Sequence, residues 1–392
     1  MNSVELFAGC GGLALGLHRG GFSHVAVIDW DEHACGTLAR NKAERRAGVD
    51  QWTVIRADVR QFDFHTIAPR IDLVAGGVPC QPFSIGGKHR GYDDDRNLFP
   101  EMLRGVRELQ PKAVLIENVR GLKRPAFLQY FSYLELALAY PELRPREGEN
   151  WADHRARLER YHTRGKPDGL HYQVVHAVLN AADYGVPQKR ERVFIVAIRS
   201  DLGAEFAFPP VTHSEQGLLW SQYATQEYWE RHAIAVRRRP TPSAAVRSKV
   251  DQIGQDLRRC LQPWQTVRDQ LCDLPPPARL RSEMEPGLTH FLVPGARSYA
   301  GHTGSKWDEP AKTLKAGDHG VPGGENMLAD DCGVRYFTIR ESARLQTFPD
   351  EYVFPGSWTE SMRQIGNAVP VLLAEMIGTK LHTTLRGHPG DK

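Results

Sequence analysis

One cysteine stands in a setting that suits a nucleophile. Cys80 follows Pro79, precedes Pro82 by two positions, and leads into a polar stretch of Gly, Lys, His, Arg and Asp over residues 84–96. The apolar run Ile71–Ala75 predicts a strand that ends shortly before it. A thiol near the carboxyl end of a strand, followed by a polar loop that covers it, is well placed for covalent catalysis. A buried, inert cysteine is the alternative.

A carboxylate is expected beside this thiol. The run Ala113–Asn118 predicts the next strand of the sheet, and Glu117 lies near the end of that strand. Because neighbouring parallel strands end at the same edge of a sheet, the carboxylate of Glu117 and the thiol of Cys80 converge there. The alternative is a sheet-edge carboxylate that caps the following helix.

A glycine-rich turn follows the first predicted strand, Val4–Ala8. It contains Gly9 and Gly11, and Asp29 ends the next strand, twenty residues after Gly9. Sheets of α/β proteins bind nucleotide-like ligands at such an edge, with the carboxylate on a ribose. Because Gly9, Gly11 and Ala14 also match the G-x-G-x-x-A pattern, the turn alone does not separate NAD from another adenosine-containing cofactor.

Two further side chains extend this candidate pocket. Trp30 directly follows Asp29 and suits an adenine face, while Asp58 follows the third strand and suits the adenine amino group. Taken singly, a core tryptophan and an N-cap aspartate are the alternatives. Together the two residues follow successive strand ends, as one pocket requires.

Short apolar runs alternate with helical patterns over the first 200 residues, which predicts an α/β domain with a mainly parallel sheet. The predicted strands are Val4–Ala8, Val25–Asp29, Thr53–Arg56, Ile71–Ala75, Ala113–Asn118, Gln173–Leu179 and Val193–Ile198. Residues 141–170 are polar and read as an insertion, whereas residues 205–335 are rich in Pro, Gly and Arg and predict a smaller, loop-rich second domain. The apolar stretch Val371–Leu381 predicts a last helix that belongs to the first domain.

The composition is that of a soluble globular protein. The chain has 392 residues, 41% of them hydrophobic, and no apolar run approaches the ~20 residues that span a bilayer. None of its six cysteines forms a C-x-x-C pair, so no disulfide framework or metal site is expected. The net charge is only +3, but residues 231–297 hold twelve Lys and Arg against six Asp and Glu, which favours a local polyanion site. A solvated surface loop is the alternative for this basic stretch.

Eight ordered motifs resemble those of DNA cytosine-5 methyltransferases, in particular bacterial modification enzymes. They are Leu6-Phe7-Ala8-Gly9-x-Gly11-Gly12, Asp29-Trp30, Asp58, Pro79-Cys80-Gln81-x-Phe83-Ser84, Glu117-Asn118-Val119, Gln188-x-Arg190-x-Arg192, Arg340-Glu341-x-Ala343-Arg344-Leu345-Gln346-x-Phe348-Pro349 and Gln364-Ile365-Gly366-Asn367-Ala368-Val369-Pro370. The resemblance covers nearly the whole chain except residues 141–170 and most of 205–335. It implies a Rossmann-like methyltransferase sheet with a target-recognition domain.

The resemblance also implies the chemistry. Cys80 would add to C6 of an extruded cytosine, so that C5 can take a methyl group from S-adenosylmethionine. Glu117 would hold the cytosine at N3 and its amino group, and Arg192 would contact the base. Arg190 would place positive charge beside the base and its phosphates.

The remaining implied roles concern the cofactor and the DNA. The cofactor-binding residues would be Phe7, Gly9, Gly11, Asp29, Trp30, Asp58, Pro79 and Asn367, with Asn367 returning beside Pro79. The DNA-binding residues would be Ser84, Arg96, Gln188, Arg237, Arg238 and Arg239. No metal is implied.

The expected organisation is a catalytic domain of residues 1–204 and 351–392, with a target-recognition domain and hinge over 205–350. The expected partner is double-stranded DNA, with no membrane. By family analogy, a cognate restriction endonuclease that acts on the same site is a further candidate partner. The protein is expected to be a cytoplasmic monomer.

Three other functions stay open at this point. The same motifs serve a branch of the family that methylates transfer RNA, although the long second domain favours duplex DNA. A NAD-dependent oxidoreductase would use Gly9, Gly11 and Asp29 but leaves Cys80 and Glu117 without a role. A catalytically inactive DNA-binding regulator is disfavoured because both of those residues are present.

Overall fold

The fold is that of a computed structural model, which describes residues 1–68, 70–79, 97–165, 168–253, 261–279, 289–300, 303–316, 324–330 and 333–387. Three predicted site residues, Cys80, Ser84 and Arg96, lie outside these ranges. Within the ranges, no helix combines the length and the apolar character that a membrane crossing requires.

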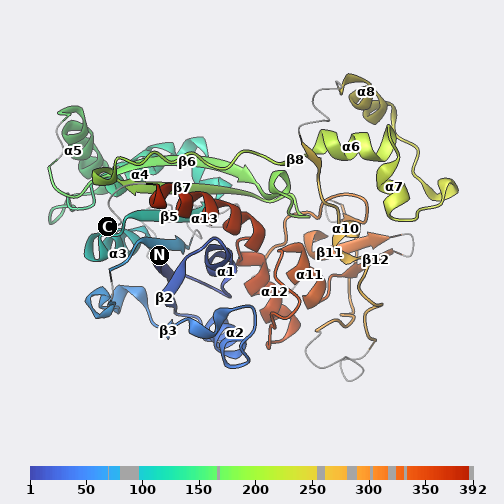
Figure 1. Ribbon diagram of the computed structural model, residues 1–392, viewed down its shortest axis with the longest axis horizontal. Coiled ribbons are helices and arrows are strands. Elements are labelled where there is room, and N and C mark those ends of the chain that lie inside the picture. Colours follow the sequence, from blue (N-terminus) through green and yellow to red (C-terminus); the bar gives the residue numbers. More distant parts are fainter. Residues whose placement is uncertain are drawn as a thin grey trace.

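A seven-stranded sheet forms the centre of the larger part of the molecule (Figure 1). Its strands lie in the order β3-β2-β1-β4-β5-β7-β6. They are β1 (Asn2–Leu6), β2 (Ser23–Asp29), β3 (Val54–Arg56), β4 (Leu73–Gly77), β5 (Ala113–Val119), β6 (Tyr172–Asn180) and β7 (Glu191–Arg199). The first five are parallel, whereas β7 runs antiparallel to both β5 and β6. The predicted α/β class with a mainly parallel sheet is therefore confirmed, and each of the seven predicted runs forms a strand.

Helices cover both faces of this sheet. They are α1 (Gly12–Arg19), α2 (Glu32–Ala43), α3 (Phe99–Leu109), α4 (Leu128–Ala139), α5 (Trp151–Thr163) and α13 (Val371–Arg386). The two ends of the chain meet where α13 packs on α1 (Figure 1). At Gly16 of α1, a Cβ atom would lie 2.3 Å from the Cβ of Ala374, so this close approach requires glycine. The last helix thus packs on the first helix of the chain.

The predicted polar insertion contains a helix, α5, that the sequence pattern did not indicate. Asn150 caps it by accepting hydrogen bonds from the backbone N–H groups of Ala152 and Asp153. Only His154 and Leu158 of this helix are buried, so its apolar face is too narrow to produce a helical pattern in the sequence.

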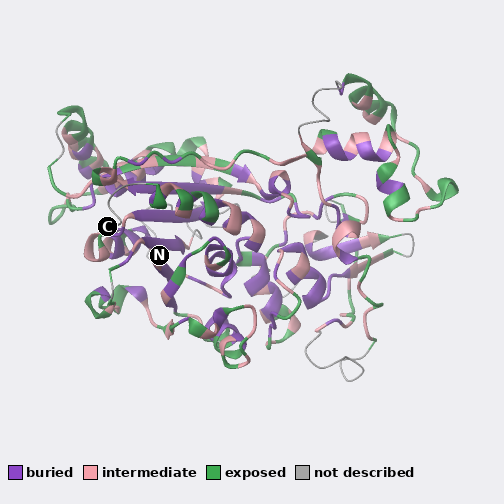
Figure 2. Cartoon of the chain, viewed as in Figure 1, coloured by how far each residue is buried: buried purple, intermediate pink, exposed green. Residues whose placement is uncertain are grey.

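The second part of the molecule is built from short elements joined by loops, as expected. They are β8 (His213–Ser214), α6 (Glu215–Tyr223), α7 (Glu227–Arg231), α8 (Ala244–Gln252), β9 (Gln262–Pro263), α10 (Val267–Leu271), β10 (Ser305–Lys306), β11 (Met327–Asp330), β12 (Gly333–Tyr336), α11 (Ile339–Leu345) and α12 (Trp358–Asn367). Figure 2 shows that the central sheet is largely buried, whereas α8 is largely exposed.

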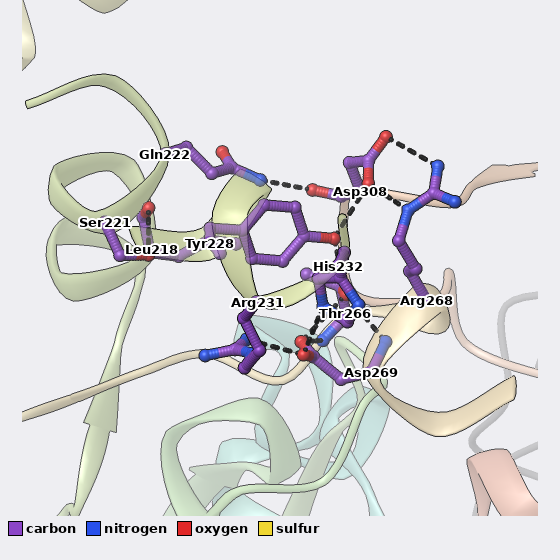
Figure 3. A network of polar contacts seen from close by, with 10 residues as sticks. All are labelled: Leu218, Ser221, Gln222, Tyr228, Arg231, His232, Thr266, Arg268, Asp269 and Asp308. Carbon is purple, nitrogen blue, oxygen red and sulfur yellow. Dashed lines mark hydrogen bonds and ion pairs between the residues drawn. The ribbon is translucent and has the colours of Figure 1, made fainter. Parts of the chain in front are cut away.

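A hydrogen-bonded network ties the helices α6 and α7 to the rest of this second part (Figure 3). The hydroxyl of Tyr228 on α7 donates to Asp308 over 2.8 Å and lies 2.9 Å from the hydroxyl of Thr266. Asp269 accepts hydrogen bonds from Thr266 and lies 2.8 Å from Nε2 of His232. The apolar core beside this network contains only three buried side chains, Leu218, Tyr228 and Trp229.

One hydrophobic cluster contains residues from both sides of residue 350, the predicted boundary between the two domains. It contains Ala8 and Cys10 of the glycine-rich turn together with Leu314, Leu328 and Phe337, and it continues into α11 and α12. Residues from about 311 onward therefore pack in one core with the beginning of the chain, while the helices α6 to α8 lie apart from that core (Figure 1).

Candidate active site

A buried ion pair lies at the carboxyl edge of the sheet. Glu117 of β5 is the register partner of Gly77 on β4, and Val119 is the partner of Arg192 on the antiparallel strand β7. Nε of Arg192 lies 2.9 Å from Oε1 of Glu117, and the two side chains are only 14% and 9% exposed. The structure thus brings together two of the predicted catalytic residues.

The environment of Glu117 raises its pKa. Burial is the largest cause, and the positive charges of Arg192 and Arg190 oppose it without cancelling it. A carboxyl group with a raised pKa exchanges a proton more readily near neutral pH than an exposed one. It can therefore both accept a hydrogen bond from an amino group and favour a proton on a neighbouring ring nitrogen.

Asn118 stands in the motif Glu117-Asn118-Val119, and the sequence alone predicted no role for it. Its side-chain amide donates to the backbone carbonyl of Val78 over 3.1 Å, and its carbonyl accepts from the N–H of Val119. The side chain is buried, so these bonds hold Pro79 and its predecessor against the end of β5. A buried amide directly after a candidate catalytic carboxylate was the signal that could have identified it.

Arg190 does not reach the surface of this site. Its side chain is fully buried, and its guanidinium donates to the carbonyls of Leu314, Gly366 and Ala368 over 2.8 to 3.0 Å. Arg190 therefore joins the chain that returns from the second part to the end of α12. This geometry corrects the expectation that Arg190 lies beside the substrate, although its charge still acts on Glu117.

Gln188 is also buried where the chain returns from the second part, and it does not lie on a DNA-facing surface. Its carbonyl accepts from the N–H of Leu314 over 2.9 Å, and its amide donates to the carbonyl of Leu345 and the side chain of Gln346. A fully buried side chain with these partners is not available to DNA in this conformation. The expectation of a DNA contact fails here because residues 311–316 cover Gln188.

The glycine-rich turn has the backbone of a ligand loop. Phe7 has a φ of 57°, Gly9 of 55° and Gly11 of 83°, and such a value is uncommon for a bulky residue like phenylalanine. The carboxylate of Asp29 holds this turn by accepting the Gly9 N–H over 2.7 Å, and its other oxygen accepts the Asp31 N–H. Burial raises the pKa of Asp29 while these hydrogen bonds lower it in part.

Trp30 and Asp58 lie at the ends of the neighbouring strands. Trp30 is 71% exposed, which rules out the alternative of a packed core side chain. Asp58 caps the short 3-10 helix η2 (Val59–Gln61) and forms an ion pair with Arg60 over 2.6 Å, which lowers its pKa. The N-cap alternative for Asp58 is thus realised, and its partly exposed carboxylate keeps lone pairs for a ligand.

Two predicted cofactor residues, Pro79 and Asn367, lie at or just after the ends of different elements. Pro79 is half-buried after β4, and Asn367 is the exposed last residue of α12. Across the part of the chain that the structure describes, the Asn367 side chain has no hydrogen-bonding partner. A role beside Pro79 stays a prediction.

Two other cysteines near the turn are unsuited to be nucleophiles. Burial raises the pKa of Cys10 to about 12 and that of Cys35 to about 11. The reactive form of cysteine is the thiolate, which is scarce near neutral pH at such values. Cys80 thus keeps its place as the candidate nucleophile on sequence grounds.

The three predicted DNA-binding arginines differ in their surroundings. Arg239 donates to the carbonyl of Ile234 and to the side chain of Gln226, which fixes the turn η10 (Val236–Arg238). Arg237 and Arg238 are exposed on this turn, and their side chains make no hydrogen bond or ion pair with any described residue. Two of the three arginines are therefore available to a polyanion.

One group of metal-binding residue types occurs within the described ranges. Asp63, His65 and Glu108 place one ligand atom each within 4.8 Å of one another. Glu108 is already paired with Arg104, and two members of the group are exposed. Nothing else in the structure points to a metal there.

Known proteins resemble this chain along its whole length. The family model described as C-5 cytosine-specific DNA methylase matches residues 1–135 and 153–383. The type II methyltransferase M.NgoMIV of Neisseria gonorrhoeae is 33% identical over 98% of this chain and 98% of its own length. The type II methyltransferase M.Eco47II of Escherichia coli is 33% identical over 96% of this chain and 77% of its own.

A solved structure shares the fold. The Dnmt2 methyltransferase of S. pombe aligns with a TM-score of 0.54 over 98% of this chain and 99% of its own, at 17% identity. With the coverage of the family model and the two type II relatives, the assignment is secure: this chain belongs to the C-5 cytosine-specific DNA methylase family.

Proposed function

We propose that this enzyme methylates C5 of a cytosine within a specific duplex DNA sequence, through a covalent bond from Cys80 to C6. The observation that carries the proposal is the buried pair of Glu117 and Arg192. Glu117 lies on β5, the strand that pairs with β4, and only two residues lie between Gly77 at the end of β4 and Cys80. An acid-base group and a cation thus face the strand end that leads to the nucleophile.

The chain's own residues account for the electron movements. The Cys80 thiolate adds to C6, the C5–C6 double bond opens, and its electron pair moves toward C5 while N3 takes a proton favoured by Glu117. C5 then takes the methyl group as the carbon–sulfur bond of the donor breaks. Loss of the proton on C5 to a base restores the C5–C6 double bond and expels the thiolate, and N3 releases the proton that it took in the first step.

S-adenosylmethionine supplies, when bound, an electrophilic methyl group on a positively charged sulfur. The residues around the turn suit this ligand. A Cβ atom at Gly9 would meet nothing within 4 Å, so the turn is open there, and the exposed ring of Trp30 offers a face to adenine. Asp29 uses one lone pair on each oxygen for Gly9 and Asp31, so others remain for ribose hydroxyls.

Duplex DNA is the proposed substrate, and Arg237 and Arg238 are the proposed contacts to it in the second part. Both arginines are exposed, and their side chains have no partner among the described residues, which leaves them able to contact phosphates. A cytosine inside a duplex hides C5 and C6 in the base stack, so the proposal includes extrusion of the target base.

The covalent step has a direct test. A duplex with 5-fluorocytosine at the methylated position has no removable proton on C5, so the enzyme should remain bonded to it after methyl transfer. A denaturation-resistant complex whose mass includes one methyl group is expected, and Cys80→Ala should not form it. If Cys80→Ala forms the same adduct, or if transfer RNA but not DNA is methylated, the proposal is wrong.

The cofactor has a separate test. S-adenosylmethionine should raise the unfolding temperature, and NAD at the same concentration should not, because only a ligand that binds the native state stabilises it. Trp30→Ala should reduce the shift while the protein without ligand unfolds at the same temperature. A shift with NAD alone would favour the oxidoreductase alternative.

A further inference from the structure

The glycine-rich turn has a backbone that needs contacts from outside to keep its shape. Phe7 has a φ of 57°, and a bulky residue persists in this left-handed region only where its surroundings hold it there. One such contact comes from the sheet, where the N–H of Gly9 donates to the carboxylate of Asp29 over 2.7 Å. A second contact, at the carbonyl of Cys10, comes from a distant part of the chain.

Tyr352 makes this second contact from 342 positions further along the chain. Its hydroxyl donates a hydrogen bond to the carbonyl of Cys10 over 2.7 Å. The side chain is completely buried, and burial raises the pKa of Tyr352 well above its usual value, so the hydroxyl stays protonated and able to donate. Because loss of a buried hydrogen bond leaves its acceptor without a partner, this bond helps to fix the turn in place.

The other neighbours of Tyr352 in its cluster are aromatic and apolar. The centroid of its ring lies 5.2 Å from that of Phe348 and 5.5 Å from that of Phe354. All three side chains belong to the buried hydrophobic cluster that also contains Cys10. Phenylalanine would fill such a cluster as well as tyrosine does, and it would bury no polar atom. The hydroxyl of Tyr352 therefore serves the turn and not the packing.

The same part of the chain also holds the neighbouring loop of the candidate cofactor site. The guanidinium of Arg363 on α12 lies 2.8 Å from the carboxylate of Asp31, whose backbone N–H donates to Asp29. At Gly12, a Cβ atom would lie 2.4 Å from the carbonyl of Val369, so the chain after α12 lies directly against the end of the turn. Both loops proposed to bind the cofactor are thus supported by residues near the end of the sequence.

We propose that Tyr352 is a positioning residue for S-adenosylmethionine, because its hydrogen bond to Cys10 keeps the glycine-rich turn in the shape that receives the cofactor. The proposal rests on the cofactor site proposed above. Tyr352 acts through the turn and not on the ligand, since its side chain is completely buried. Without the hydroxyl, the ligand has to order a looser turn when it binds, so affinity falls. The chemical step in the saturated enzyme is unaffected.

The test measures the Kd of S-adenosylmethionine by calorimetry. Tyr352→Phe removes the hydroxyl and keeps the ring, so the Kd should rise roughly fivefold, as expected for one neutral hydrogen bond. The kcat at saturating cofactor and the KM for DNA should stay near the wild-type values. Tyr336→Phe is the matched control, because Tyr336 is also buried and packed on an aromatic ring, but its hydroxyl has no hydrogen-bonding partner in the described ranges. Its Kd should be that of the wild type.

A third variant separates positioning from packing. Phe354→Leu makes the aromatic cluster smaller without removing the hydroxyl of Tyr352. The unfolding temperature should fall further in this variant than in Tyr352→Phe, because a large buried side chain has been shortened. The Kd of S-adenosylmethionine should nevertheless stay near the wild-type value.

Hydrogen exchange tests the turn directly in the protein without ligand. The backbone amides of residues 9–12 should exchange faster in Tyr352→Phe than in the wild type, because local opening of the turn no longer breaks the bond to Cys10. Tyr336→Phe should exchange at the wild-type rate. This measurement depends on neither the cofactor nor the activity.

Three results would overturn the proposal. They are an unchanged Kd in Tyr352→Phe, an equal rise of the Kd in Phe354→Leu, and unchanged exchange of residues 9–12 in Tyr352→Phe. Failure of the proposed function is distinguishable, since the wild-type protein itself would then not bind S-adenosylmethionine. The proposal for Tyr352 would fail with it, even if the exchange of the turn still differed.

Discussion

The central sheet and the helices of the second part are stabilised by different interactions. The sheet has large apolar clusters on both faces, built from its strands and the helices that cover them. The unit of α6 and α7 has three buried apolar side chains and relies on the hydrogen bonds of Tyr228, Asp269 and Asp308. Apolar burial is non-directional, whereas a buried hydrogen bond is lost when either partner changes.

This difference suits the roles proposed for the two regions. A sheet held by non-directional packing keeps its strand ends in place while single core residues vary in sequence. A unit held by a few directional bonds changes its shape when one residue changes. We expect the first region to keep its chemistry across relatives and the second to be the part in which a change of sequence changes the surface offered to DNA.

The largest effect should come from the ion pair at the sheet edge. Glu117→Gln keeps the shape of the side chain but removes its charge and its acid-base function, so kcat should fall ~10²–10³-fold. The shift of the unfolding temperature with S-adenosylmethionine should be unchanged, which separates chemistry from cofactor binding. Near-normal turnover in Glu117→Gln would show that Glu117 is not a catalytic residue.

A large loss of stability is expected from the neighbouring arginine. Arg190→Met removes the donors to three buried carbonyls, so the free energy of unfolding should fall by about 2–4 kcal/mol in urea titrations. Arg192→Met is the matched control and should lose activity with a smaller change in stability. If the Arg190→Met protein is stable but inactive, Arg190 acts at the substrate site and not as a structural residue.

Acid should weaken the sheet region through His24. Burial lowers the pKa of His24 to about 4 from an ordinary value of 6.5, and Nε2 lies 2.7 Å from the carbonyl of Ala14, which can only accept. Between these two values the unfolded chain binds more protons than the folded one, so stability is complete above pH 6.5 and falls as the pH drops toward 4. The loss should reach about 3 kcal/mol at the lower end.

The measurement is the unfolding temperature of the wild type and of His24→Gln over this range of pH. The difference between the two proteins should shrink as the pH falls, because only the wild type has this proton to bind. A pH-independent difference would contradict the assignment of a neutral, buried His24.

Loss of one hydroxyl, that of Tyr228, should weaken the polar network of the second part. Tyr228→Phe deprives Asp308 and Thr266 of a partner and should cost about 1–2 kcal/mol of stability. Affinity for specific DNA should fall, whereas the shift with S-adenosylmethionine should stay. Tyr223→Phe is the control, because the Tyr223 hydroxyl has no hydrogen-bonding partner in the described ranges, and equal effects of both changes would argue against the network.

The smallest effects are expected at the exposed turn. Arg237→Ala and Arg238→Ala should each weaken DNA binding mildly and reduce the slope of log affinity against log salt by about 1. Arg239→Ala should act through the turn that it holds and leave that slope nearly unchanged. Binding at four salt concentrations decides between them, and an equal loss of slope in all three would contradict the division.

The amino-acid sequence predicts the central sheet and the residue types at its carboxyl edge. Seven apolar runs became strands, and the signal is clearest where parallel strands such as β1 and β4 are buried, because such strands need a continuous apolar sequence. Glu117, Asp29 and Trp30 were identified because each stands at the end of such a run. Their meeting at one edge follows from the parallel order alone.

Residues with similar local sequence patterns have different contacts in the folded chain, and these contacts cannot be predicted from the sequence. Arg190 and Arg192 stand two positions apart, yet residues 314 and 366–368 surround the first, and the second lies beside Glu117. Arg239 differs from Arg237 and Arg238 only by its contacts with Ile234 and Gln226. The helix α5 and the packing of its Trp151 could not be predicted from the sequence for the same reason. In each case the partner lies elsewhere in the chain, and sequence spacing carries no information about a contact that folding creates.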